Sequence, residues 1–348
     1  MCADTGLFRF QYRGKVMANI DKATRFWKTI REVSVKNISL EARRPISVIV
    51  VGDEELRREI IHQLTIDRSA SNQSEKFVPV LSINSTHPND GFPTNLLDDT
   101  LIIDVGGGRS SVMTEAPVFA LNEFGSWEKM LERIIDDRPE LSLSLARSYP
   151  AFRPIVVDRI IRETALANAE FSMLNALPGV VPLVAPLLPA TAIGDIFMLT
   201  KNQAMMLFRL AAAHDLSLDP RARSRELGPM LGNAFGWRAI AREVIGIVPG
   251  GFGLVARGAI SYAGTIAVGR ALDRFYDTGQ LPDRTQINLY YKDAYAGAKK
   301  IVEERYDQLK RSRLRSRSRK IEFKKVSAEK RPVEALLVAS EEDVFESE

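Results

Sequence analysis

The sequence predicts a small α/β domain with a parallel sheet, followed by an all-α, apolar helical-hairpin domain. Short runs rich in β-branched residues alternate with helical segments as far as residue 150, which is typical of a parallel sheet with helical crossovers. From Pro154 onward, helical periodicity replaces this alternation. Two long stretches, residues 171–194 and 239–272, are then strongly apolar, and the first contains no charged residue. A chain of 348 residues has room for about two such domains.

Composition and cysteine usage exclude several classes of protein. Apolar residues make up 45% of the chain and the formal net charge is +4, which argues against a disordered or collagen-like protein. The single cysteine, Cys2, excludes a disulfide framework. With only three histidines, His62, His87 and His214, a Cys/His zinc site is not expected, and we predict no metal site.

The predicted α/β domain covers residues 45–150 and follows an N-terminal segment, residues 1–44, that contains an amphipathic helix. Residues 46–51 are apolar and β-branched, as in a strand buried on both faces. Pro79 places the second strand at a sheet edge. We expect strands at residues 46–51, 77–83, 100–105 and 117–121, and a helix at residues 53–64.

The junction between the first strand and this helix is where a phosphate-binding loop would lie. Such a loop needs a second glycine five residues after the first, then a lysine for the phosphate charge and a hydroxyl for magnesium. Here Gly52 is the first glycine, but Arg57, Arg58 and Glu59 occupy the three later positions. The chemistry of a phosphate loop is therefore largely missing.

The third strand ends in Asp104, and Gly107 follows three residues later. In nucleotide triphosphatases an Asp-x-x-Gly sequence after an apolar strand coordinates magnesium and senses the γ-phosphate. The same residues also fit a strand that ends in a glycine turn. A guanine-reading Asn-Lys-x-Asp sequence is absent, since residues 122–125 read Asn-Glu-Phe-Gly. We predict a degenerate P-loop GTPase-like domain. Its vestigial cofactor-binding residues are Gly52, Arg57, Arg58, Asp104 and Gly107.

The predicted helical domain covers residues 151–298. Residues 177–189 contain four prolines, which argue against one straight helix and favour two arms joined by an apolar crossing. That crossing either enters a bilayer part-way or packs inside a helical bundle. The second apolar stretch has a glycine-rich break, and alanines at positions 259, 263 and 267 form a stripe that allows close helix packing.

The C-terminal tail, residues 299–348, is first basic and then acidic. Residues 299–331 contain fourteen basic and five acidic residues, and residues 332–348 contain six acidic residues and no basic ones. The Arg-Ser run at 310–320 reads as a flexible arm that would be drawn to anionic lipids. Nucleic acid is the other polyanion it could bind, but no aromatic residues interleave the arginines.

Several short segments resemble the YcjF-like family of unknown function. They include Trp27–Glu32, Tyr149–Pro154, Leu166–Ala169, Leu199–Gln203 and Tyr262–Thr265. In bacteria this domain follows Era-like GTPase modules and is usually described as a membrane protein. The resemblance covers most of residues 20–280 and implies no reaction. Because Arg57, Arg58 and Glu59 depart from the GTPase pattern, GTP hydrolysis does not carry over.

The sequence as a whole predicts a non-enzymatic, membrane-associated protein with a vestigial GTPase-like interaction module, in a scaffolding or regulatory role. Residues 1–18 lack the apolar segment of a secretory signal, so we expect both termini in the cytoplasm. The expected partners are the lipid bilayer and other proteins, with no cofactor. Two alternatives stay open: a working nucleotide switch that uses GTP and magnesium, and nucleic-acid binding through the Arg-Ser tail.

Overall fold

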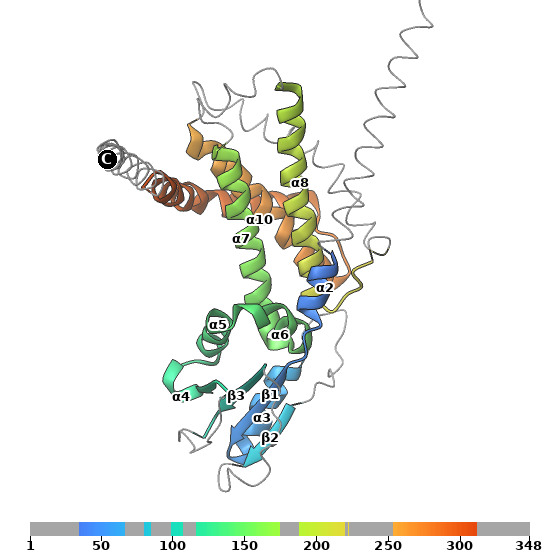
Figure 1. Ribbon diagram of the computed structural model, residues 1–348, viewed down its shortest axis with the longest axis vertical. Coiled ribbons are helices and arrows are strands. Elements are labelled where there is room, and N and C mark those ends of the chain that lie inside the picture. Colours follow the sequence, from blue (N-terminus) through green and yellow to red (C-terminus); the bar gives the residue numbers. More distant parts are fainter. Residues whose placement is uncertain are drawn as a thin grey trace, which may run out of the picture.

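The computed structural model describes residues 35–66, 80–84, 99–106, 116–174, 188–219, 222 and 253–311. A small parallel sheet with its flanking helices lies at one end of this structure, and long helices extend from it (Figure 1). The prediction of an α/β part followed by a helical region is confirmed at this level.

The described strands form one four-stranded parallel sheet in the order β2-β1-β3-β4. In register, Val50 of β1 lies between Ser82 of β2 and Ile103 of β3. The second strand is at an edge, as predicted, and residues 77–79 of its predicted range lie outside the described residues. The strands are β1 (Ser47–Gly52), β2 (Val80–Asn84), β3 (Thr100–Asp104) and β4 (Val118–Ala120).

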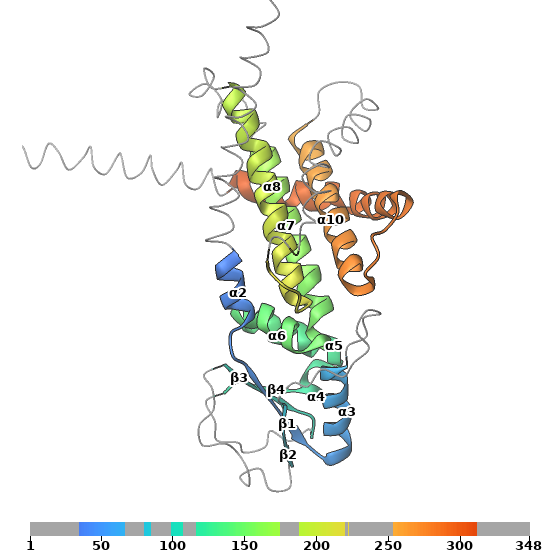
Figure 2. The same ribbon diagram turned by 90° about the vertical axis from the view of Figure 1, so that its right-hand side faces the viewer.

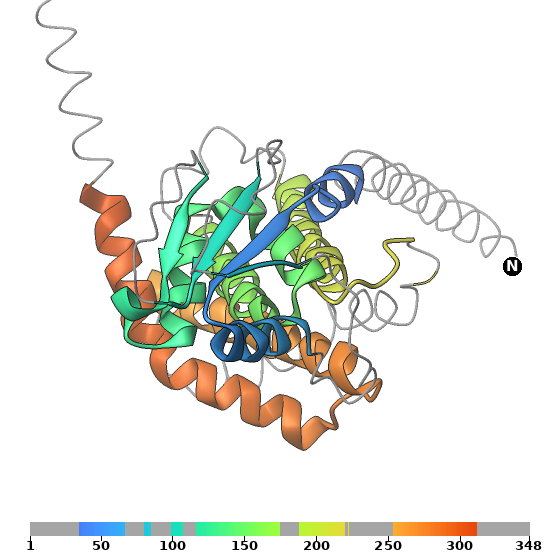
Figure 3. The ribbon, with the colours of Figure 1, turned by 90° about the horizontal axis from the view of Figure 1, so that it is seen from below.

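Short helices surround the sheet. Helix α3 follows β1 directly, as the sequence predicts, and it lies beside the sheet when the molecule is viewed from below (Figure 3). Helix α5 begins after Ser126, whose hydroxyl accepts a hydrogen bond from the Lys129 amide, and its Met130 and Ile134 are fully buried. The elements are α2 (Lys36–Ala42), α3 (Glu54–Thr65), α4 (Leu121–Phe124), α5 (Trp127–Asp137), η2 (Pro139–Leu141), α6 (Ser142–Ser148) and η3 (Pro150–Phe152).

Helices α7 (Arg153–Leu174), α8 (Leu188–Ala213) and α10 (Leu254–Thr278) form the body of the helical region (Figure 2). Both α8 and α10 pack against α7. A further helix spans residues 284–311 and buries Val302 in a cluster with residues of α7 and α10. This helix continues through residue 299, the predicted start of the C-terminal tail. Most of the Arg-Ser run lies outside the described residues.

A buried polar network joins the three long helices. The Asn168 amide on α7 donates to the Thr265 hydroxyl on α10 at 3.0 Å, and its side-chain oxygen accepts from Asn202 on α8 at 2.8 Å. Asn168 is 1% exposed. These three residues come from three of the segments on which the family resemblance rests.

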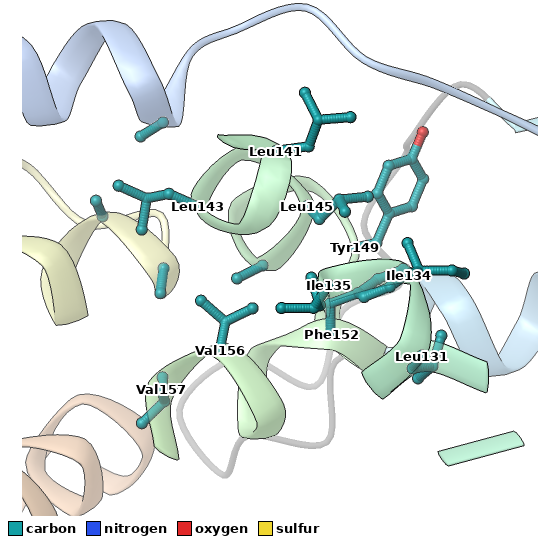
Figure 4. Close-up of a cluster of buried hydrophobic side chains, with 14 of the residues drawn as sticks. Leu131, Ile134, Ile135, Leu141, Leu143, Leu145, Tyr149, Phe152, Val156 and Val157 are labelled. Carbon is teal, nitrogen blue, oxygen red and sulfur yellow. The ribbon is translucent and has the colours of Figure 1, made fainter. Parts of the chain in front are cut away.

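One hydrophobic core runs from the sheet into the long helices. It includes Val48 of β1, Phe152 of η3, Leu207 of α8 and Leu272 of α10. Figure 4 shows part of this core, with side chains from α5, η2 and α6 together with Val156 and Val157 of α7. The predicted boundary between residues 150 and 151 stays a prediction, although apolar packing continues across it.

The helices contradict the prediction that the protein is membrane-associated. Among the residues that the structure describes, no helix is both long enough and apolar enough to cross a bilayer. Helix α8 has Asp195, Lys201 and Arg209 within its 26 residues. Its apolar side chains at the C-terminal end, such as Leu207, are buried in the shared core. The Pro-rich residues 177–187 lie outside the described part, as does the glycine-rich break at residues 246–252.

Candidate functional site

The chain passes from β1 into α3 through a single residue. Strand β1 ends at Gly52, and α3 begins at Glu54. Between them, Asp53 caps the helix by accepting a hydrogen bond from the Leu56 amide at 3.1 Å. A phosphate loop needs several residues here, so that successive backbone N–H groups can surround the phosphates. This junction has no such loop, and a carboxylate already occupies the helix N-terminus.

Gly52 allows two backbone segments to approach each other closely. Its φ is +153°, and an added Cβ would lie 2.5 Å from Cγ2 of Val105 and 2.9 Å from the backbone nitrogen of Gly106. The Val105 amide donates to the Val51 carbonyl at 2.8 Å in the same region. The packing of β1 against the turn after β3 therefore accounts for this glycine without a phosphate.

The two arginines at the predicted phosphate positions lie inside α3 and contact their own helix. Arg57 is 9% exposed, and its Nε donates to the Asp53 carbonyl at 3.3 Å. Arg58 is exposed and forms an ion pair with Glu54, one turn earlier. With Glu54 and Glu55 in the first turn, the N-terminus of α3 is negatively charged, which opposes binding of a phosphate.

Asp104 lies at the carboxyl end of β3, opposite Val51 of β1. The side chain is 1% exposed, and its Oδ1 accepts a hydrogen bond from the Gly106 amide at 2.9 Å. Oδ2 is buried with no hydrogen-bond partner in the part of the chain that the structure describes. After β1, the chain adds β2 on one side of this strand and β3 on the other, so the topological switch point of the sheet lies between β1 and β3. Open α/β sheets bind ligands at this position.

The structure thus unites only part of the predicted site. Gly52 and Asp104 lie together at the ends of adjacent strands. Arg57 and Arg58 are engaged within α3. Gly107 lies outside the described residues.

A second cluster of polar side chains joins the end of α8 to α10. Nε2 of His214 lies 3.1 Å from Oδ1 of Asp273, and Nδ1 lies 3.4 Å from Oδ1 of Asp277. The His214 side chain is 3% exposed, and its ring packs against Tyr276 with 5.5 Å between the ring centroids. Asp273 and Asp277 are one turn apart on α10 and partly exposed, so both carboxylates face one imidazole.

The backbone at the end of α8 fixes the position of His214. The Asp215 amide donates to Ala212 and the Leu216 amide donates to Ala211, which is the hydrogen-bond pattern of a Schellman motif. Asp215 has a φ of +56°, a conformation usually taken by glycine, and its carboxylate accepts a hydrogen bond from Arg147 Nε at 2.7 Å. The imidazole is therefore held in place before any ligand arrives.

Sequence reasoning did not find this cluster. The only local signal is the pair of aspartates at i and i+4 on an apolar helix, and such pairs are usually solvated. His214 lies 59 residues before Asp273 in the chain, so their contact depends on how α8 and α10 pack.

Comparisons of the chain with models of known protein families, with curated proteins and with solved structures find no match. The resemblance to the YcjF-like family therefore rests on the short segments quoted above and stays a prediction.

Proposed function

We propose that this chain is a non-enzymatic interaction protein, in which a degenerate GTPase-like α/β part binds protein partners and has lost nucleotide binding. The role is scaffolding or regulatory. The proposal rests on the junction between β1 and α3, where one residue stands in place of a phosphate loop.

The charges at this junction support the proposal. A nucleotide would bring its phosphates to the N-terminus of α3, where Asp53, Glu54 and Glu55 place three carboxylates. Helix N-termini stabilise anions through free N–H groups and the helix dipole. Here the Asp53 side chain occupies the Leu56 amide, and the nearby acidic residues repel a further anion.

The shared core gives a physical reason for an interaction role. The α/β part packs through Phe152 and Tyr149 into the same core as α7 and α8. A partner that binds the sheet would therefore be held in a fixed position relative to the helices. This arrangement suits a scaffold.

A working nucleotide switch is the second candidate, and one observation favours it. The buried Oδ2 of Asp104 has no hydrogen-bond partner among the described residues, and a magnesium ion could occupy that position. In this alternative Arg57 or Arg58 replaces the usual lysine, so each would have to leave its present contact within α3.

Titration of Mg·GTP and Mg·ATP against the full-length chain separates the two candidates. We expect no binding tighter than about 1 mM, which corresponds to about 4 kcal/mol. A dissociation constant below about 10 μM, or roughly 7 kcal/mol, would overturn the proposal if binding is lost in Asp104→Asn. The control Asp293→Asn removes an exposed carboxylate from the helix at 284–311 and should behave like the wild type.

A further inference from the structure

We propose that His214, Asp273 and Asp277 form a binding site for a divalent transition-metal ion such as Zn²⁺, which fastens the end of α8 to α10. One donor atom from each of the three residues lies within 4.8 Å of the others. They offer one imidazole nitrogen and two carboxylate oxygens. Zinc accepts both donor types, whereas Mg²⁺ and Ca²⁺ prefer oxygen donors alone.

One pair of donor atoms already has about the spacing of ligands around a tetrahedral ion. Zinc binds nitrogen and oxygen at about 2.0–2.2 Å, so neighbouring ligand atoms in a tetrahedron lie roughly 3.3–3.6 Å apart. The separation between His214 Nε2 and Asp273 Oδ1 is 3.1 Å, close to that value. Asp277 lies 3.4 Å from the other ring nitrogen, Nδ1, and its carboxylate would have to turn toward Nε2 to share the ion. All three residues have a donor atom within 4.8 Å of the others. Water would supply the fourth ligand.

Burial and preorganisation favour the site. The imidazole is 3% exposed, whereas the side chains of Asp273 and Asp277 are 24% and 42% exposed. An ion can therefore enter from the carboxylate side and reach a nitrogen that is shielded from water. The Schellman motif holds the backbone beside the ring, and Arg153 Nε donates to the Ala213 carbonyl at 3.1 Å. Little ordering is then needed when an ion binds.

The ion would replace the direct contacts between His214 and the two carboxylates with bonds to metal. His214 directly follows α8, and the two aspartates lie on α10. An ion bound to all three would therefore hold together the two ends of the 58-residue segment between His214 and Asp273, which stabilises the folded state. This site is separate from the junction at Gly52, so it does not depend on the proposed interaction role.

The test is titration of the metal-stripped, full-length chain with Zn²⁺, followed by calorimetry and thermal unfolding. We expect one equivalent bound with a dissociation constant of about 1 μM or tighter. At a free concentration about 100 times that constant, the ratio of folded to unfolded protein should rise about 100-fold. Co²⁺ should give the visible absorption of a tetrahedral complex, and about 1 mM Mg²⁺ should not compete.

Variants locate the ion. Asp277→Asn preserves the side-chain shape, and it should weaken Zn²⁺ binding more than about 100-fold, beyond the roughly 10- to 100-fold loss that follows removal of an outer-shell partner. Asp273→Asn should do the same, and the matched control Asp293→Asn should leave binding unchanged. Two results would overturn the proposal: no Zn²⁺ binding tighter than about 100 μM, or stoichiometric binding that persists in the double variant Asp273→Asn/Asp277→Asn. Neither measurement requires a substitution of the buried His214.

Discussion

Gly52, Arg57 and Asp104 occupy the positions that bind phosphate or magnesium in a GTPase, and each has a structural role of its own in this fold. Gly52 lets β1 approach the turn after β3. Arg57 bonds to the carbonyl of the helix cap, and one oxygen of Asp104 closes the turn at Gly106. The contacts of Arg57 and Asp104 lie within four residues along the chain, whereas that of Gly52 joins β1 to the turn after β3. None of the three contacts requires a phosphate.

Substitution of Gly52 tests the first of these roles. In Gly52→Ala the new Cβ meets Val105 Cγ2 at 2.5 Å and the Gly106 backbone at 2.9 Å. We expect the free energy of unfolding to fall by about 1–3 kcal/mol, as for other overpacked cores. Urea denaturation measures this change. In the control Gly297→Ala nothing lies within 4 Å of the new Cβ, and stability should rise by up to about 1 kcal/mol. Equal effects of the two substitutions on stability would contradict the role of Gly52 in the close approach of β1 to the turn after β3.

The buried phenol of Tyr149 should make the stability of the fold depend on pH in the alkaline range. Burial raises its pKa from the ordinary value of 10.0 to about 12, and its hydroxyl contacts the Val48 backbone. Between these two values the unfolded chain loses the phenol proton while the folded chain keeps it. Stability should therefore fall as pH rises from 10 to 12, by up to about 1.4 kcal/mol per pH unit.

Tyr149→Phe removes this contribution. Near neutral pH the variant should be about 1 kcal/mol less stable, because the hydrogen bond with Val48 is lost. Unfolding curves at increasing pH should then show the difference from wild type shrinking above pH 10. As a control, Tyr290→Phe removes the hydroxyl of a partly exposed ring and should leave the hydrogen bond between Tyr149 and Val48 in place. A constant difference across the whole range would disprove the role of Tyr149.

Among the elements, α7 organises the helical region because α8 and α10 both pack on it. Asn168 is at the centre of that packing, with hydrogen bonds to Thr265 and Asn202. A buried amide costs free energy unless it is paired, and this one also restricts how the three helices can slide past each other.

Asn168→Ala should lower the free energy of unfolding by about 1–3 kcal/mol, since the buried Thr265 hydroxyl and the partly buried Asn202 amide lose their partner. Thermal or urea unfolding measures the loss. As a control, Asn288→Ala changes an exposed residue on the helix at 284–311 and should be neutral or slightly stabilising. A loss below about 0.5 kcal/mol for Asn168→Ala would show that the network contributes little.

The elements also show what could be predicted from sequence. The periodicity of residues 46–64 predicted β1 and α3 to within one or two residues, because β-branched residues and a capping aspartate act locally. The location was predicted wrongly, because α8 includes three charged residues and the apolar side chains at its C-terminal end pack in the shared core. The contact between His214 and Asp273 was not predicted, because it arises only when two distant helices pack.

For the whole molecule, the shared core is the main structural result. Residues from the sheet, from η3 and from α7, α8 and α10 bury their side chains in one cluster. Nucleotide switches need segments that move when phosphates bind or leave. Here the strand that would carry the phosphate loop enters its helix without a loop, and its inward-facing residues, such as Val48 and Val50, belong to the shared core. We therefore expect the α/β part to keep one fixed conformation, with or without nucleotide.

Amide hydrogen exchange of the full-length chain tests this claim most directly, in the presence and absence of saturating Mg·GTP or Mg·ATP. Residues 47–58 and 100–106 contain every described backbone group at the predicted site. We predict that their exchange rates are the same with and without nucleotide. Slower exchange in both segments of the wild type, absent in Asp104→Asn, would contradict the account.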